Sequence, residues 1–261
     1  MSLQIDQSHR VLHITLNRPE KRNALTSEMC SKMVAAIESA QDDPQIGSIL
    51  ISAVGQVFCA GMDLDEAVSP GNEHLAPVHE KLFTAGAHSL KPIVLCVNGP
   101  ALGGGLGLVA QAHAAVAAEG AVFGLTEMRI GLWPFLVYRA VESALGARRT
   151  LELSLTARLF QAQEALSWGL VQYICPPAEA CHRAAAIARD LAKASPLAIQ
   201  AGLEYVRDAR DRSWREAGEL ATVLRRKIME SADFKEGYAA FKEKRDPHWP
   251  SMPQSKPKTK T

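Results

Sequence analysis

The stretch Ala101–Gln111, ALGGGLGLVAQ, places three consecutive glycines shortly after the apolar run PIVLCVNG, Pro92–Gly99. A short apolar run bounded by proline and glycine predicts a buried strand. Glycine inside a regular element costs up to about 1 kcal/mol relative to alanine, because it loses the most backbone freedom on folding. Three glycines in a row therefore predict a place where bare backbone must lie against another group.

The glycines allow two interpretations. A dinucleotide fingerprint is one, because Gly105, Gly107 and Ala110 match G-x-G-x-x-A and Glu119 ends the next predicted strand. We reject it, because the helix before Ala114 has only about eight residues, whereas a crossover needs at least about 10 and the acid lies about 20 residues on. The other interpretation is a helix whose first N–H groups are unpaired and carry its positive dipole end. Such a helix start stabilises a negative oxygen.

A second glycine-bearing turn, VFCAGMDLDE at Val57–Glu66, follows the predicted strand at 48–54 and also runs into a helix start. Two strand ends with exposed N–H groups can meet over one carbonyl oxygen. Downstream, VFGLTEMRIGLWP at Val122–Pro134 sets Glu127 in an otherwise apolar neighbourhood. Taken alone, such a glutamate is more often a capping or surface residue. If it is buried, desolvation raises its pKa toward the range that proton transfer uses.

Outward from these motifs, the first half of the chain alternates strand and helix patterns. Apolar residues at helical spacing after Thr26 predict a helix over Ser27–Gln41. From about Leu136 onward the pattern is almost entirely helical, interrupted by one strand. The alternation indicates a layered α/β fold. The expected strands are 3–7, 11–17, 48–54, 92–98, 114–120 and 170–176.

Composition limits the class of protein. The 261 residues contain 47% hydrophobic residues, which fits one large domain or a domain with a helical appendage. Lys and Arg total 29 against 28 Asp and Glu, so no basic face for nucleic acid is expected. No apolar run approaches the roughly 18 residues of a membrane span, and the N-terminus lacks a signal-peptide pattern. We therefore expect a cytoplasmic protein with no membrane partner.

The five cysteines show no C-x-x-C pairing, and most of them lie inside apolar segments. This pattern predicts buried reduced thiols rather than disulfides or metal ligands. The cysteines are Cys30, Cys59, Cys96, Cys175 and Cys181.

Six segments occur in order: LNRPEKRNAL (16–25), FCAGMDL (58–64), KPIVLCVNGPALGGGLGL (91–108), FGLTEMRIGLWP (123–134), ARLFQAQEALSWGLVQYI (157–174) and FKEKRDP (241–247). In these segments the chain resembles the enoyl-CoA hydratase/isomerase (crotonase) family. The resemblance implies an α/β spiral of ββα units with an acyl-CoA site, which we assign to residues 1–195. It also implies a helical trimerisation region, assigned to 196–250, and thus a homotrimer or hexamer. Residues 251–261 are expected to be a mobile basic tail.

The resemblance also implies chemistry through a thioester enolate held by two backbone N–H groups. By motif position these belong to Met62 and Gly104, with Glu127 as the catalytic acid and base. Coenzyme A is part of the substrate, and no further cofactor or metal is expected. The resemblance also implies residues that bind the substrate. In the turn these are Ala60, Asp63 and Leu64, and the implied basic residues are Lys21, Arg22 and Lys244, with Phe241 nearby. Trp133, Phe135 and residues 69–89 are expected to line the acyl pocket.

Two departures from the family pattern bear on function. Asp65 stands where many hydratases have a lysine, which weakens the expected phosphate site. Gly107 stands where hydratases carry the first of two glutamates that hold the added water, so Glu127 is left alone. One carboxylate can still move a proton between C2 and C4 of an enoyl thioester. Double-bond isomerisation is therefore expected ahead of hydration assisted by another polar group, and a non-catalytic acyl-CoA binder is the further alternative.

Overall fold

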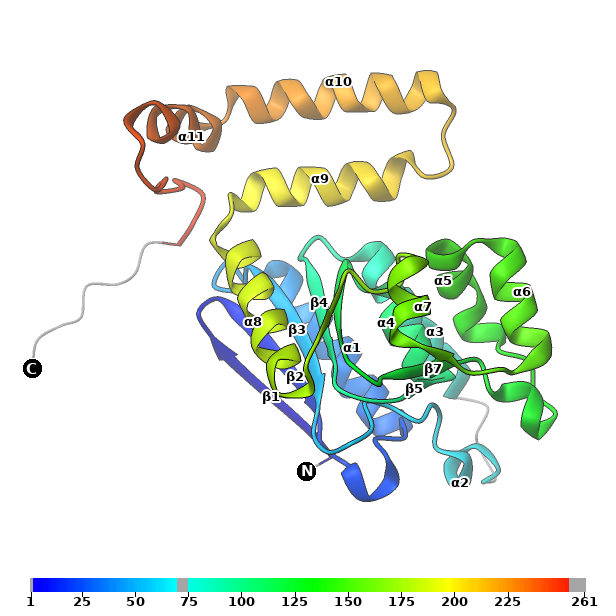
Figure 1. The fold of residues 1–261 in the computed structure, drawn as a ribbon. Coiled ribbons are helices and arrows are strands. Elements are labelled where there is room, and N and C mark those ends of the chain that lie inside the picture. The colour runs from blue at the N-terminus through cyan, green and yellow to red at the C-terminus, as the bar shows by residue number, and fades with distance from the viewer. Residues whose placement is uncertain (1, 70–74, 254–261) are drawn as a thin grey trace, which may run out of the picture.

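The structure, a computed structural model, describes residues 2–69 and 75–253. Two sheets form its core (Figure 1). In the six-stranded sheet, the first strand pairs antiparallel with the second and all other pairs are parallel. Its order is β1 (Leu3–Ser8), β2 (Val11–Leu16), β3 (Ser48–Ala53), β4 (Ile93–Val97), β6 (Ala114–Ala118) and β9 (Tyr173–Cys175). The smaller sheet contains β5 (Ala101–Leu102), β7 (Val122–Gly124) and β8 (Phe160–Gln161).

All six strands expected from the sequence are present, and β4 explains why its run is apolar throughout. Ile93 and Leu95 face the main core, whereas Val94 and Cys96 face the helix α8 (Pro177–Lys193). Side chains alternate between the two faces of a strand, so a strand covered on both faces reads as continuous hydrophobic sequence. The helix covers the sheet with alanines at four-residue spacing: Ala180, Ala184, Ala188 and Ala192.

The prediction that all five cysteines are reduced is wrong. Cys96 on β4 and Cys181 on α8 form a disulfide, whereas Cys30, Cys59 and Cys175 are free. The pair is separated by 85 residues in sequence and meets because α8 packs directly on β4. The positions of Cys96 and Cys181 in the sequence do not predict this contact.

Four helices position the cavity described below. The predicted helix after Thr26 is confirmed as α1 (Ser27–Asp42), where the Thr26 side chain accepts a hydrogen bond from the Met29 N–H. The glycine run opens the eight-residue helix α4 (Gly104–Gln111), also as predicted. Helices α3 (Leu75–His88) and α5 (Phe135–Leu145) both pack against α4. The short elements nearby are η1 (Pro19–Lys21), α2 (Leu64–Ala67), η3 (Glu127–Ile130), α6 (Ala147–Thr156) and α7 (Ala162–Ser167).

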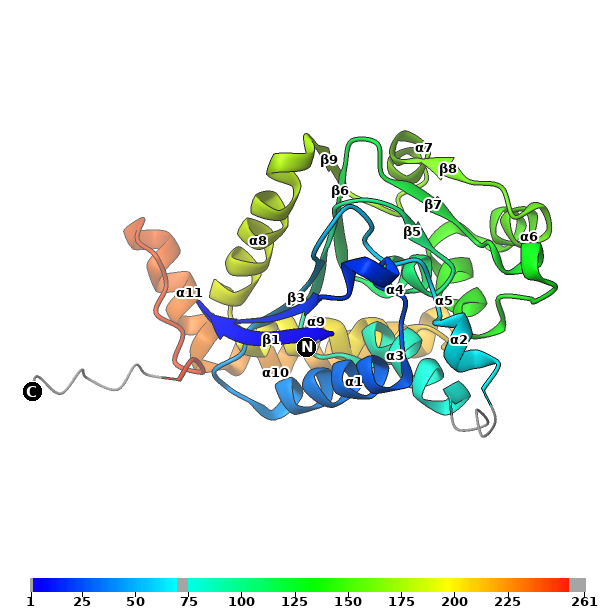
Figure 2. The ribbon, with the colours of Figure 1, turned by 90° about the horizontal axis from the view of Figure 1, so that it is seen from below.

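The last three helices run outside the sheet layers, as Figures 1 and 2 show. They are α9 (Pro196–Ala209), α10 (Trp214–Glu230) and α11 (Ala232–Glu243). No residue of α9 is buried, and α10 buries only Leu224. Helix α8 ends at Lys193 and α9 begins at Pro196; the division of the chain after residue 195 stays a prediction. Among residues 2–69 and 75–253, no helix has the length and apolar character of a membrane span.

The first residue of the expected mobile tail, Ser251, is hydrogen-bonded to the rest of the protein. Ser251 donates hydrogen bonds from its N–H and its Oγ to the Asp233 carboxylate, at 2.9 and 2.6 Å. Ser251 is therefore held against α11, and residues 254–261 are outside the described part of the chain.

Candidate active site

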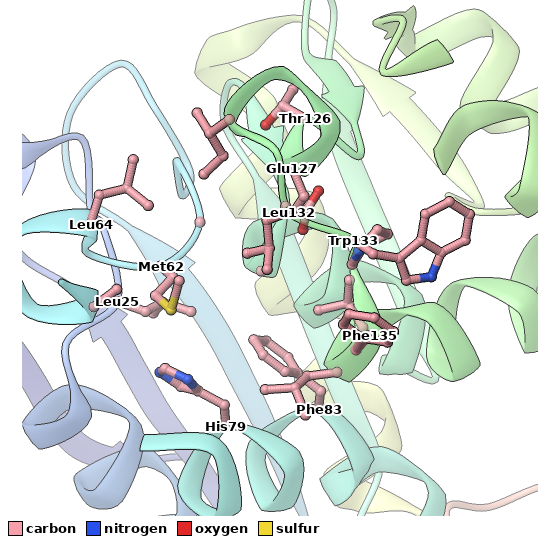
Figure 3. A pocket seen from close by; sticks show the side chains of 18 of the residues that line it. Leu25, Met62, Leu64, His79, Phe83, Thr126, Glu127, Leu132, Trp133 and Phe135 are labelled. Atoms are coloured by element: carbon pink, nitrogen blue, oxygen red, sulfur yellow. The ribbon is translucent and has the colours of Figure 1, made fainter. Parts of the chain in front are cut away.

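A cavity of about 610 Å³ opens between α3, the turn that precedes α2, the start of α4 and the segment from η3 to α5 (Figure 3). Its lining is mostly apolar. The side chains with polar groups among the described lining residues are His79, Thr126, Glu127 and Trp133, whose indole carries an N–H donor. The other lining residues include Leu25, Ala60, Gly61, Met62, Leu64, Phe83, Gly103, Gly104, Leu132, Trp133, Phe135 and Val137.

The turn at Ala60–Asp63 is held by the segment Arg22–Leu25. Leu25 N–H donates to the Gly61 carbonyl at 2.8 Å, and Asp63 N–H donates to the Leu25 carbonyl at 2.9 Å. These bonds form a parallel bridge between Leu25 and Met62. The N–H of Met62 takes no part in the bridge, and Met62 lines the cavity. The pairing thus fixes the turn while leaving one N–H group for a ligand.

Asp63 anchors this turn and does not line the cavity. Its carboxylate pairs with Arg18 and accepts a hydrogen bond from the Glu66 N–H, which caps α2. Burial opposes ionisation, but Arg18 and the N–H groups of Glu66 and Asp65 hold the pKa of Asp63 below its usual range. We therefore replace the expected coenzyme contact of Asp63 by a structural role.

The three glycines of the run have different neighbours. Gly103 has a φ of +52°, and a Cβ built there would lie 3.1 Å from Glu127 Oε1. A Cβ on Gly104 would lie 3.0 Å from Phe83 Cζ and 3.6 Å from Gly61 Cα. On Gly105 it would lie 2.4 Å from the Cys59 carbonyl oxygen. Gly104 is the first residue of α4, so its N–H has no partner within the helix. The helix start and the turn therefore present main chain to the same cavity.

Glu127 lies at the start of η3, with its carboxylate against Gly103. Burial raises its pKa, and the N–H groups of Glu127 and Thr126 offset this only in part. Its Oε2 is buried and has no hydrogen-bond partner in the described part of the chain. The expected partial desolvation is confirmed, and a carboxylate in this state is a stronger proton acceptor than one in water.

Gly107 does not line the cavity, and no space is left for a side chain there. A Cβ at this position would lie 2.5 Å from Val137 Cγ1 and 3.1 Å from Phe83 Cδ1. The place of the second glutamate in the family pattern is thus filled by packing between α4, α5 and α3. Among the described lining residues, Glu127 is the one carboxylate.

The structure brings together only part of the predicted binding set. Ala60, Leu64, Trp133 and Phe135 line the cavity, as do Ala76, His79 and Phe83 from the expected 69–89 segment; residues 70–74 of that segment lie outside the described residues. Lys21 and Arg22 are exposed to solvent and do not line the cavity. The Lys21 Nζ lies 3.1 Å from an Asp65 oxygen.

The prediction that Phe241 and Lys244 join this site is not fulfilled within one chain. Phe241 lies near the end of α11 and is 83% exposed, and Lys244 follows it as the C-cap. In Figures 1 and 2, α11 and α2 stand at opposite ends of the molecule. The physical reason is that α9 and α10 carry α11 away from the cavity.

Sequence reasoning missed His79 and Leu25 as individual lining residues. His79 occurs on an amphipathic helix without any motif, so its pattern is that of an ordinary core histidine. Leu25 closes RNAL and is fully buried at the bridge to Met62. Its place in the pocket depends on the pairing of two loops that are distant in sequence.

Comparison with known proteins decides the family. The model of the family described as enoyl-CoA hydratase/isomerase matches residues 6–252. The chain belongs to the enoyl-CoA hydratase/isomerase family. An enoyl-CoA hydratase of Mycobacterium tuberculosis is 34% identical over 253 residues, covering 94% of this chain and 95% of that protein. A rat mitochondrial Δ(3,5)-Δ(2,4)-dienoyl-CoA isomerase is 28% identical over 263 residues, covering 94% and 80%.

The solved structures confirm the predicted fold. A crystal structure of an enoyl-CoA hydratase from Bacillus anthracis matches with a TM-score of 0.91 at 26% identity, covering 96% of this chain and 100% of that one. The fold is therefore the α/β crotonase fold with C-terminal helices, and the protein is an enoyl-CoA hydratase/isomerase family enzyme of acyl-CoA thioesters. Hydratases and isomerases both occur among the relatives, so family membership does not select between the two reactions.

Proposed function

We propose that this family member isomerises the double bond of an enoyl-CoA thioester, with Glu127 as the single acid and base. The observation that carries the proposal is the pairing of one desolvated carboxylate with a filled space at Gly107. Hydration through two glutamates requires a second carboxylate across the substrate from the first. Here Val137 and Phe83 occupy that space.

In the proposed reaction, the thioester oxygen accepts hydrogen bonds from the N–H groups of Met62 and Gly104. These donors stabilise the negative charge that develops on the oxygen. Glu127 removes a proton from C2 of a 3-enoyl thioester, and the C–H electron pair becomes part of a dienolate. Glu127 then returns the proton to C4, which leaves the double bond between C2 and C3. The proton and the electrons balance without water or a cofactor.

Hydration is the second candidate, because relatives such as the Mycobacterium tuberculosis protein are named hydratases. The addition of water to C3 would need a polar group besides Glu127 to orient it. Thr126, His79 and Trp133, through its indole N–H, are the other described lining residues with polar groups in their side chains. Direct comparison of substrates separates the two candidates.

The experiment follows conversion of 3-hexenoyl-CoA and of crotonyl-CoA by the same protein preparation. We expect faster turnover of 3-hexenoyl-CoA, with 2-hexenoyl-CoA as the product. Faster formation of 3-hydroxybutyryl-CoA from crotonyl-CoA would contradict the isomerase proposal and support hydration. Tight binding of acyl-CoA without conversion of either substrate would support a non-catalytic binder.

We further propose that α9, α10 and α11 form the interface of a homotrimer or hexamer. Their exposed faces carry large apolar side chains, including Trp214 at 97% exposure, Val223, Phe234, Tyr238 and Phe241. Exposed aromatic and aliphatic side chains in this number are typical of protein interfaces. In such an assembly, Lys244 and Phe241 would bind the coenzyme portion at a neighbouring copy. Light scattering after size-exclusion chromatography tests the assembly, and a monomer would contradict it. The cytoplasmic location stays a prediction, since the rat relative is mitochondrial by name.

A further inference from the structure

His79 is a buried polar side chain that the proposed reaction does not use. It lies on α3, is 3% exposed and belongs to the cavity lining. Its Nε2 is buried without a hydrogen-bond partner in the described part of the chain. Buried polar atoms are nearly always paired, and an unpaired one costs about 1–3 kcal/mol. A bound molecule that supplies the partner would remove this cost.

The surroundings of His79 define the partner that it can accept. Phe83 is its aromatic neighbour, with 6.1 Å between ring centroids. Burial lowers the pKa of His79 more than the nearby Glu66 carboxylate raises it. The neutral imidazole then offers one N–H donor and one nitrogen acceptor. No lysine or arginine occurs among the described lining residues, and the Glu66 charge disfavours an anion. The environment thus suits a neutral oxygen.

The position of His79 separates it from the reacting atoms. Figure 3 shows it at the other side of the cavity from Glu127, below Met62 and beside Phe83. With the thioester oxygen at Met62 and Gly104, and with C2 to C4 at Glu127, a group that reaches His79 must belong to another part of the acyl chain.

We propose that His79 selects substrates whose acyl chain carries a hydroxyl or keto oxygen beyond the reacting carbons, which hydrogen-bonds to Nε2. The inference rests on the proposed acyl-CoA site and adds the class of acyl group that the site accepts. A plain hydrocarbon chain of the same length leaves Nε2 unpaired. The preference for an oxygenated chain over a hydrocarbon chain therefore has two sources: the oxygenated chain gains a hydrogen bond, and the hydrocarbon chain leaves His79 Nε2 unpaired.

The test measures binding rather than turnover. Saturated ligands cannot isomerise, so hexanoyl-CoA is compared by calorimetry with its 4-, 5- and 6-hydroxy and 5-keto derivatives. We expect at least one oxygenated ligand to bind the wild type about tenfold more tightly than hexanoyl-CoA, as one satisfied buried polar group predicts. The His79→Leu variant should lose this preference, because leucine offers no atom for a hydrogen bond. His79→Gln should retain part of it.

Glu80→Gln is the matched control, because Glu80 is the next residue of α3 and is exposed. It should keep the full preference. If the wild type binds hexanoyl-CoA but prefers none of the oxygenated ligands, the inference is wrong and a cavity water is the partner of Nε2. This result needs no variant, so a folding defect in His79→Leu does not affect it. If the wild type binds no acyl-CoA at all, the proposed function fails and this inference fails with it.

Discussion

The two walls of the cavity are built from different parts of the chain. The backbone wall consists of the turn and the start of α4, represented by Gly61, Met62, Gly103 and Gly104. The side-chain wall comes from α3 and from the segment that joins η3 to α5, represented by His79, Phe83, Leu132, Trp133 and Phe135. Figure 3 shows the labelled side chains of both walls around one cavity.

The two walls differ in how much their residues can change, which indicates that they serve different functions. On the backbone wall, an added Cβ meets neighbouring atoms within 3.0–3.6 Å at Gly103 and Gly104, so little variation is possible there. The side-chain wall has no such restriction, because residues of similar volume can replace one another with small losses of stability. We infer that oxyanion stabilisation depends on the backbone wall and that selection of the acyl group depends on the side-chain wall.

The largest expected effect comes from Glu127→Gln, which removes the base that lies against the backbone wall. The amide keeps the shape of the carboxyl group but cannot accept the proton. We expect turnover to fall by about 10²- to 10⁴-fold, with acyl-CoA affinity nearly unchanged in calorimetry. A variant that keeps more than about a third of the wild-type rate on every substrate would rule out Glu127 as the base.

The thermal stability of the Glu127→Gln variant provides a second test of the buried carboxylate. Burial raises the pKa of Glu127, so folding favours its protonated form and the ionised form costs stability at neutral pH. Glu127→Gln should therefore unfold at a higher temperature than the wild type at pH 7. The difference should shrink as the pH falls through the raised pKa, because the wild-type carboxyl group then becomes neutral as well.

Gly104→Val breaks the backbone wall itself. Its Cβ would meet Phe83 at 3.0 Å and the larger side chain would fill the position of the thioester oxygen. We expect turnover to fall by about 10²- to 10³-fold, as for the loss of one oxyanion donor. Gly218→Val on α10 is the control, since a Cβ there meets nothing within 4 Å in the same chain; light scattering must show that it keeps the wild-type assembly. Circular dichroism must show that both variants are folded, and normal turnover by a folded Gly104→Val would contradict the assigned oxyanion site.

Gly107→Glu tests whether a glutamate at this position is enough to restore the second carboxylate of the hydratases. From the sequence alone, this change favours the helix and adds a water-holding group. The structure overturns that expectation, because the new Cβ would lie 2.5 Å from Val137 Cγ1. We expect a loss of about 1–3 kcal/mol in the free energy of unfolding, as for overpacking of a core.

The pair Gly107→Glu with Val137→Ala provides the space that the single change lacks. It should recover part of the stability and raise the hydration of crotonyl-CoA relative to isomerisation of 3-hexenoyl-CoA. Chemical denaturation and the two substrate assays measure both effects. An unchanged ratio in a folded, CoA-binding double variant would remove the main support for the single-glutamate reaction.

The smallest effect is expected outside both walls, at Asp65. Its ion pair with Lys21 is exposed, and exposed pairs contribute about 1 kcal/mol or less. Asp65→Lys restores the charge that many hydratases carry at this position, so acyl-CoA should bind up to about fivefold more tightly at low salt. Asp190→Lys is the control, because Asp190 forms a similar exposed pair with Lys193 on α8. An equal gain in both variants would show a general effect of charge rather than a phosphate contact.

The sequence allowed much of the fold to be predicted because its signals are local. The helix cap at Thr26, the continuous apolar run of β4 and the glycines before α4 each act within a few residues. The apolar neighbours of Glu127 predicted its desolvation, whereas its role as the base was implied only by the family resemblance. The Cys96–Cys181 disulfide and the crowding at Gly107 were not predictable, because each depends on a contact between elements distant in sequence.

By itself, the sequence determined the strands of the larger sheet, the helix after Thr26, the family motifs and the candidate base, but it did not predict the short strands β5, β7 and β8. Only the tertiary structure decided that Val137 and Phe83 fill the space above Gly107, that Asp63 holds Arg18, and that His79 Nε2 is buried without a partner. The physical reason is that local propensity and periodicity act over one or two turns of chain. Burial and unpaired polar atoms arise only when α3, α4 and α5 pack together around the cavity.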